Sequence, residues 1–228
     1  MDGSNPMSGV LRALTRFPRK GRGRVLMLIS AHREEGTSSV VRAVCDATGA
    51  ATTLLLDLDL LRNAQFKAYQ DQSLRDGPGL STAVDGRLKG ARLYRLMTPD
   101  GRVRMEERSA LSYHRVGRSK LFVSSFDAHA VAEGDRTQIL ANATYWDAAR
   151  QSCDLMLVDA PALERSRAGL TIAPHVDAVA LVVSGADKAA AGAIGLKNEL
   201  EAVNAPIAGL VYTRADPMAL TLERLLPI

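Results

Sequence analysis

Short apolar segments that alternate with helical stretches constrain this chain more than any other feature of its sequence. Four of them are VLMLIS (25–30), TTLLLDLDL (52–60), DLMLVDAP (154–161) and DAVALVVS (177–184), and IAGLVYTR (207–214) is a fifth. Runs this short and apolar are typical of strands buried on both faces of a sheet. With the helical stretches between them, they predict an α/β fold. We expect a doubly wound, mostly parallel sheet with helices on both faces, in three α/β/α layers.

The length and the local patterns suggest how the chain is organised. A chain of 228 residues suits one α/β domain. We predict that residues 1–22 are a basic, disordered tail and that residues 23–228 form the domain. Segment 92–107 alternates around a Thr-Pro-Asp-Gly turn, which predicts a small inserted β-hairpin. The insertion is expected to span about 91–120.

Other segments carry weaker signals. GPGLSTAVDGRL (77–88) predicts a turn and a short helix, and a buried strand is expected at about 120–125. Asp135 is a suitable cap for a helix over 136–151, and a short helix is expected after Pro217.

The composition argues for a cytoplasmic protein. No apolar run approaches the ~18 residues of a membrane span, and the polar N-terminus does not resemble a signal peptide. Cys45 and Cys153 are far apart and each adjoins an apolar segment, so we expect two small buried hydrophobic side chains in a reducing compartment.

The net charge of +4 is unevenly distributed. Residues 1–24 carry six basic side chains against one acid, and residues 86–120 carry ten against three. Basic appendages suggest an anionic partner, either a membrane surface or nucleic acid, although a solvated surface has the same composition.

Polar residues gather where three predicted strands end. The turn 31–39 follows the first strand, Asp57 and Asp59 follow the second, and Asp159 ends a later one. In parallel sheets, ligands bind just beyond these carboxyl ends. Backbone NH groups at a helix start cradle phosphate, and carboxylates bind magnesium.

Five ordered motifs then resemble a known family. They cover residues 25–216, and they resemble the MinD- and ParA-related P-loop ATPases. The closest resemblance is to the cytoplasmic ATPase domain of bacterial tyrosine kinases (BY-kinases), which regulate capsule and exopolysaccharide synthesis. The motifs are SAHREEGTSSV (30–40), LLLDLDLLRN (54–63), GPGLSTAVDGRL (77–88), CDLMLVDAPAL (153–163) and the run 173–216.

The resemblance implies an ATP and magnesium site. Its nucleotide-binding positions are Arg33, Glu35, Gly36, Thr37, Ser38, Ser39 and Thr213. Its metal positions are Ser38, Asp57 and Asp159, and in an active enzyme the catalytic acids are Asp57, Asp59 and Asp159.

The departures from the family pattern predict a loss of activity. Thr37 replaces the lysine that contacts the β- and γ-phosphates, and Glu34 replaces a glycine. Thr213 stands where relatives often have an adenine-binding asparagine, and no tyrosine follows Tyr212 to serve as a phosphate acceptor. We expect an acidic site without its cationic side, and no required cofactor, although ATP with magnesium stays possible.

We therefore expect a catalytically silent BY-kinase-like protein. It would act as a cytoplasmic regulatory or scaffold partner of a membrane-anchored polysaccharide co-polymerase, in a holdfast-type or other exopolysaccharide system. It would lie peripheral to the inner face of the plasma membrane, near its anionic surface, and homo-oligomers are possible. Two alternatives stay open. One is a working ATPase or kinase that uses Lys188 or Lys120. The other is a ParA-like protein that binds DNA through 86–120, although nucleic acid is the less favoured partner.

Overall fold

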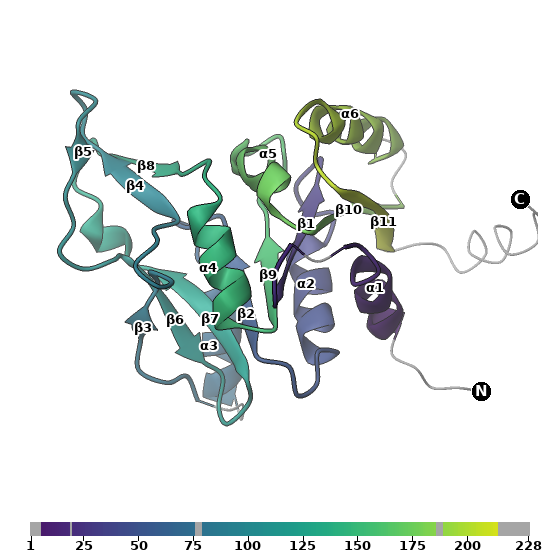
Figure 1. The fold of residues 1–228 in the computed structure, drawn as a ribbon, viewed down its shortest axis with the longest axis horizontal. Coiled ribbons are helices and arrows are strands. Elements are labelled where there is room, and N and C mark those ends of the chain that lie inside the picture. Colours follow the sequence, from purple (N-terminus) through teal and green to yellow (C-terminus); the bar gives the residue numbers. More distant parts are fainter. Residues whose placement is uncertain (1–5, 19, 76–78, 186–188, 214–228) are drawn as a thin grey trace, which may run out of the picture.

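A central β-sheet organises the molecule (Figure 1). The computed structural model describes residues 6–18, 20–75, 79–185 and 189–213. In this part of the chain the main sheet has eight strands in the order β11-β10-β1-β9-β2-β7-β6-β3. The parallel strands are β1 (Arg24–Ser30), β2 (Thr53–Asp57), β7 (Leu121–Phe126), β9 (Leu155–Asp159), β10 (Ala178–Ser184) and β11 (Ile207–Thr213). At one edge, β6 (Leu111–Arg115) pairs antiparallel with β7, and β3 (Val84–Asp85) pairs antiparallel with β6.

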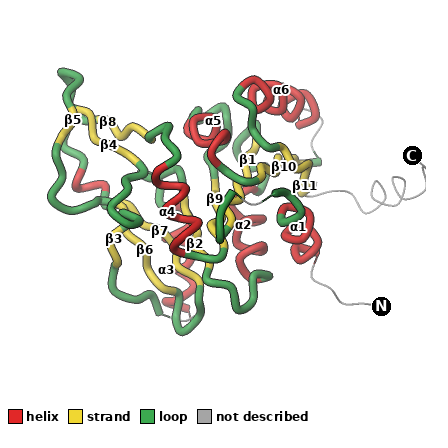
Figure 2. Tube along the Cα trace, in the orientation of Figure 1, coloured by secondary structure: helices red, strands yellow, loops and turns green. Residues whose placement is uncertain are grey.

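Helices cover both faces of the sheet, as predicted (Figure 2). Because successive side chains of a strand point to opposite faces, Leu26 and Leu28 of β1 join one hydrophobic core, and Met27 and Ile29 join another. The first core is covered by α1 (Pro6–Leu14), α2 (Thr37–Asp46) and α3 (Ala64–Arg75). The second is covered by α4 (Thr144–Ser152), α5 (Ala168–Ile172) and α6 (Ala189–Ala202). Two single-turn 3₁₀ helices, η1 (Ala128–Ala130) and η2 (Ala173–His175), lie in connections.

The predicted hairpin is present, in a sheet larger than expected. Strands β4 (Tyr94–Met97) and β5 (Val103–Arg104) pair antiparallel, and β8 (Arg136–Ile139) pairs with β4 on its other side. The helix predicted over 136–151 is therefore wrong at its start, because residues 136–139 alternate in exposure as a strand does. The insertion boundaries of 91–120 are wrong too. Strand β6 belongs to the main sheet, whereas β8 belongs to the small one.

Two further local predictions have different outcomes. No helix forms over the described residues 79–88, where the chain is extended and contains the short strand β3. The helix expected after Pro217 lies outside the described residues. Both cysteines are free and buried, as predicted. None of the described helices has the length and apolar character needed to cross a membrane.

The described part of the N-terminal segment, residues 6–18 and 20–22, belongs to the fold. Residues 1–22 were expected to be disordered, but α1 packs on α2 and on the strands β10 and β11. Met7, Val10 and Leu14 recur at helical spacing and pack on the sheet, and Leu14 is buried. The amphipathic pattern of this segment, rather than its basic charge, therefore explains why α1 is folded and packed.

Candidate functional site

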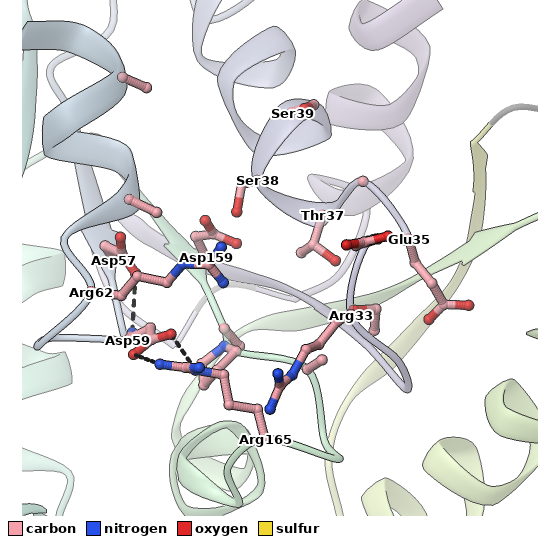
Figure 3. A pocket seen from close by; sticks show the side chains of 18 of the residues that line it. Arg33, Glu35, Thr37, Ser38, Ser39, Asp57, Asp59, Arg62, Asp159 and Arg165 are labelled. Atoms are coloured by element: carbon pink, nitrogen blue, oxygen red, sulfur yellow. Dashed lines mark hydrogen bonds and ion pairs between the residues drawn. The ribbon is translucent and has the colours of Figure 1, made fainter. Parts of the chain in front are cut away.

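A cavity of about 760 Å³ lies beyond the carboxyl ends of β1, β2 and β9. Its wall is built by the loop 31–39, the first turns of α2 and α3, and the segment after β9 (Figure 3). Six of the predicted nucleotide positions line this cavity, and so do all three acids. These residues are Arg33, Glu35, Gly36, Thr37, Ser38, Ser39, Asp57, Asp59 and Asp159.

The loop 31–39 has a tight, fixed backbone. Gly36 has a φ of 92° and caps α2, and Glu34 has a φ of 63°, a left-handed conformation that favours glycine. The family resemblance puts a glycine at this second position, so the loop keeps the glycine conformation although the residue has changed. The Glu34 side chain is exposed.

Hydrogen bonds within the loop and from two other segments hold its backbone in place. The Glu35 carboxylate accepts a hydrogen bond from the His32 backbone NH at 3.0 Å. The hydroxyl of Thr213 donates to the Glu35 carbonyl at 2.5 Å. Thr213 thus supports the loop from behind, and it is not among the described residues that line the cavity.

Glu164, in the segment after β9, binds the start of the loop. Its carboxylate accepts from the Arg33 backbone NH at 2.7 Å and lies 3.0 Å from His32 Nδ1. The hydrogen bond with His32 is the main cause that lowers the pKa of Glu164. The loop is therefore preorganised before any ligand binds.

Two of the acids lie side by side in the sheet. Asp57 of β2 is the register partner of Asp159 of β9, and both side chains are buried. Burial, followed by the charge of Asp159, raises the pKa of Asp57 to about 7. Burial also raises the pKa of Asp159. The two carboxylates disfavour each other's charge.

Gln65, from the first turn of α3, satisfies this acidic pair from within the protein. Its side-chain amide nitrogen donates to Asp159 Oδ2 at 2.6 Å and to the Ser38 carbonyl at 3.1 Å. Its backbone NH donates to Asp57 Oδ2 at 3.0 Å, and its amide oxygen accepts from Arg42 at 3.1 Å. Gln65 is completely buried.

This arrangement does not suit the magnesium ion that the resemblance implies. Magnesium needs oxygen lone pairs that face a shared point. Here an amide NH₂ group reaches Asp159 from the side of Ser38.

The loop also contains no lysine. Thr37 opens α2, and its buried hydroxyl has no hydrogen-bond partner among the described residues. Lys120, a proposed substitute, lies at the amino edge of the sheet, where its carbonyl accepts from Thr53 at the start of β2. About 13 Å of strand separates that edge from the cavity. Lys188 lies outside the described residues.

Positive charge reaches the cavity from the loop and from other elements. The expectation of a site without a cationic side is wrong, because five arginine and lysine residues line it. Figure 3 shows Arg33, Arg62 and Arg165 extending into the space between the loop and the acids. Arg165 Nε lies 2.6 Å from Asp59 Oδ2, so Asp59 is paired. The remaining two basic residues are Arg42 and Lys67.

Sequence reasoning missed Gln65 and four of these basic residues. Arg62 stands inside the second acidic motif and was the easiest to find. Gln65, Lys67 and Arg165 carry no motif of their own, since only the folding of α3 and of the segment after β9 brings them to the cavity.

Comparison with known proteins supports this fold. No protein-family model matches the sequence, and no curated protein matches it. The crystal structure of the chimerical protein CapA2B2 superposes with a TM-score of 0.59 at 14% identity, over 94% of this chain and 86% of that one. The VpsO kinase domain gives 0.58 at 16% identity, over 93% and 95%. The septum site-determining protein MinD from Pyrococcus horikoshii OT3, complexed with Mg-ADP, gives 0.57 at 15%, over 90% and 79%.

These neighbours share the architecture of this chain. Identities of this size establish shared architecture, and function has to be argued from the site itself. The loop and the acids lie together at the carboxyl ends of the parallel strands, where the sequence motifs put them. The chain therefore has the P-loop NTPase-like α/β/α fold of the MinD/ParA-like ATPases and the BY-kinase domains.

Proposed function

We propose that this chain is a catalytically silent BY-kinase-like protein that acts as a cytoplasmic regulatory or scaffold partner of a membrane polysaccharide co-polymerase. The observation that carries the loss of catalysis is the buried amide of Gln65, which donates to Asp159 at 2.6 Å. In this position a hydrogen-bond donor of the protein takes the role of a divalent cation.

The chemistry of phosphoryl transfer supports the same interpretation. That reaction depends on positioning and on charge stabilisation by a lysine and magnesium at the transferred group. Thr37 supplies neither charge nor reach. The basic residues around the cavity are partly engaged, because Arg165 pairs with Asp59 and Arg42 bonds with Gln65. Without magnesium at the acidic pair and without a lysine in the loop, the site lacks the two groups on which this charge stabilisation depends.

The proposed partner follows from the resemblance to BY-kinase ATPase domains, which dock on the cytoplasmic ends of polysaccharide co-polymerases. A regulatory role needs a preorganised surface and no turnover. The anchored loop, held by Glu164, Glu35 and Thr213, offers such a surface.

The basic hairpin gives little support for a DNA-binding role. Four of the arginines in 86–120 form ion pairs with nearby acids: Arg87 with Asp85, Arg92 with Glu106, Arg102 with Asp100, and Arg104 with Asp135. Paired charges contribute less to the counterion release on which non-specific DNA binding depends.

Two measurements test the proposal. Purified protein should release no phosphate from Mg-ATP, and the variant Asp57→Asn should behave like wild type. Peptides from the cytoplasmic ends of the organism's polysaccharide co-polymerase should bind the protein, whereas peptides of scrambled sequence should not. Asp57-dependent phosphate release would refute the silent assignment, and a lack of peptide binding would refute the proposed partner.

A further inference from the structure

A second cavity, of about 550 Å³, lies at the opposite end of the parallel strands from the first. It opens between α1, the carboxyl end of α2 and the amino ends of β1 and β9. Three arginines line it, Arg12 of α1 with Arg22 and Arg24 ahead of and within β1, against the single acid Asp154.

The charge balance of this cavity favours an anionic ligand. One oxygen of Asp154 already accepts a hydrogen bond from the Thr52 backbone NH at 2.9 Å. Arg12 and Arg22 form no ion pair with any residue that the structure describes, and both are exposed. Exposed guanidinium groups without an ionic partner suit a phosphate ester, which they bind through paired hydrogen bonds.

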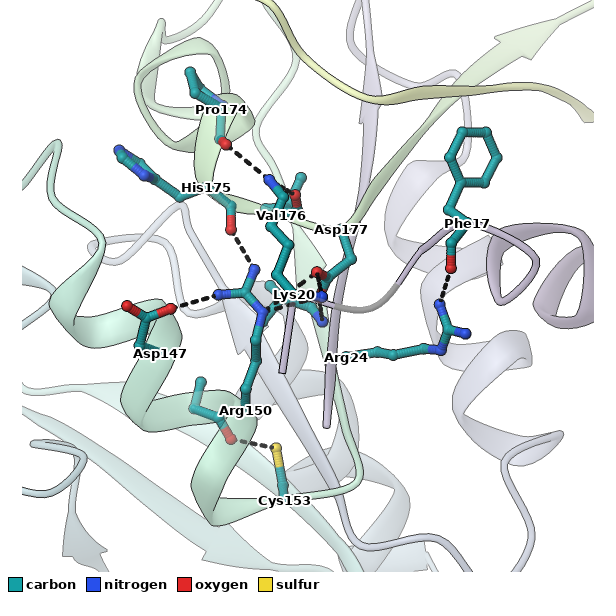
Figure 4. A network of polar contacts seen from close by, with 12 residues as sticks. Phe17, Lys20, Arg24, Asp147, Arg150, Cys153, Pro174, His175, Val176 and Asp177 are labelled. Carbon is teal, nitrogen blue, oxygen red and sulfur yellow. Dashed lines mark hydrogen bonds and ion pairs between the residues drawn. The ribbon is translucent and has the colours of Figure 1, made fainter. Parts of the chain in front are cut away.

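A buried polar network fixes the segment that carries two of these arginines (Figure 4). Asp177 accepts from the backbone NH groups of Lys20 at 3.0 Å and Val25 at 2.7 Å, and it pairs with the buried Arg150 at 3.1 Å. The Lys20 ammonium donates to the Val176 carbonyl at 2.7 Å. The segment 20–25 is thus held at both ends.

Two further contacts complete this preorganisation. Arg24 donates to the carbonyl of Phe17, which holds the chain that leaves α1. A Cβ at Gly23 would lie 2.1 Å from the Cys153 carbonyl oxygen, so the backbone passes close enough to α4 and β9 to require glycine. The backbone that carries Arg22 and Arg24 is therefore fixed by the fold.

The other residues that line the cavity favour a lipid over a nucleic acid as its ligand. Leu11, Ala47, Ala51 and Leu155 give the cavity an apolar part beside its arginines. The described residues that line it include no aromatic side chain on which a base could stack. An apolar floor beside a cationic rim matches an amphiphile with a phosphate head.

We infer that this cavity, formed by α1 and the segment 20–25, binds the phosphate head group of an anionic phospholipid. The inference rests on the proposed function in one respect, since both place the chain at the inner membrane surface. Of the two basic segments, it assigns the membrane contact to 1–24 at the amino edge of the sheet, and so leaves the first cavity facing away from the membrane.

Vesicle sedimentation of the full chain tests this inference. The protein should sediment with vesicles that contain phosphatidylglycerol and not with pure phosphatidylcholine vesicles. The double variant Arg12→Gln/Arg22→Gln should partition about 25-fold more weakly, because each cation near such a surface contributes about fivefold. A control with the same charge loss, Arg108→Gln in the connection before β6 and Arg136→Gln in β8, should keep the wild-type partitioning. Unchanged melting temperatures would show that all variants fold.

Three outcomes would overturn the inference. Equal losses in both double variants would mean diffuse attraction without a site. Melting shifts with inorganic phosphate that depend on Arg12 and Arg22, without vesicle binding, would indicate a free phosphate ligand. Stronger binding to a single-stranded oligonucleotide than to vesicles would indicate nucleic acid.

If site-dependent vesicle binding holds while the co-polymerase peptides do not bind, the proposed function fails and this inference stands. The reverse result refutes the inference alone.

Discussion

Replacing Asp159 by asparagine should stabilise this protein at neutral and alkaline pH. Asp159 is buried beside Asp57, and its charge is the second cause, after burial, of the raised pKa of Asp57. In the variant, the asparagine oxygen still accepts from Gln65, and its NH₂ group can donate to the Ser38 hydroxyl. The substitution removes a buried charge at little cost in hydrogen bonds.

The size of the effect follows from the pKa of Asp57. This pKa rises from its ordinary value of 3.8 to about 7 in the fold, so between these pH values the folded state binds more protons than the unfolded state. The contribution of Asp57 to stability is therefore present below about pH 4 and is lost as the pH rises to about 7. The loss amounts to at most about 4 kcal/mol. Because Asp159 accounts for less of this shift than burial does, we expect the variant to gain about 1–2 kcal/mol at pH 8.

Thermal unfolding at pH 5 and pH 8 measures this gain. A gain of 1–2 kcal/mol corresponds to a rise of about 2–8 °C in melting temperature for a chain of this size. The rise should appear at pH 8 and shrink at pH 5, where Asp57 is protonated in the fold. A variant less stable than wild type at pH 8, or one with an unchanged pH dependence, would refute this reasoning about the acidic pair.

Three other substitutions test further contacts of the fold and the site. Gln65→Ala should lower the free energy of unfolding by about 1–3 kcal/mol in urea titrations, since it leaves a buried carboxylate without its donor; a neutral effect would contradict the role given to this amide. Asp177→Asn should cost about 3–5 kcal/mol, because Arg150 stays buried without a counter-charge; a loss below 1 kcal/mol, by the same titration, would count against the network. Gly23→Ala should lower the melting temperature clearly, because its Cβ meets a backbone oxygen; calorimetry showing no change would disprove the close approach.

The sequence predicted the layers of the fold well because buried parallel strands leave an unambiguous pattern. The runs that became β1, β2, β9, β10 and β11 are almost wholly apolar, and each forms a strand of the main sheet. The predictions failed where one local signal competed with another. Asp135 resembles a helix cap, but its side chain is buried against Arg104, and the residues after it form β8.

The candidate site was predictable only in part. The loop 31–39 and the three acids stand at strand ends, where topology brings them together whatever the intervening sequence is. Gln65 was not predictable, because a glutamine in the first turn of a helix is ordinary until the fold places its amide beside Asp159. The same holds for Arg165, whose partner Asp59 lies 106 residues away in sequence.

Titration of the purified protein with Mg-ATP, followed as heat and as melting temperature, tests the loss of nucleotide chemistry most directly. A ligand present at about 100 times its Kd would stabilise the fold by about 2.7 kcal/mol, and so raise the melting temperature by about 5–10 °C. We predict no heat and no shift for the wild type. We expect measurable binding for the double variant Thr37→Lys/Gln65→Ala, which restores the lysine and clears the amide from Asp159. Magnesium-dependent binding by the wild type, with phosphate release that Asp57→Asn abolishes, would contradict the assignment of a silent site.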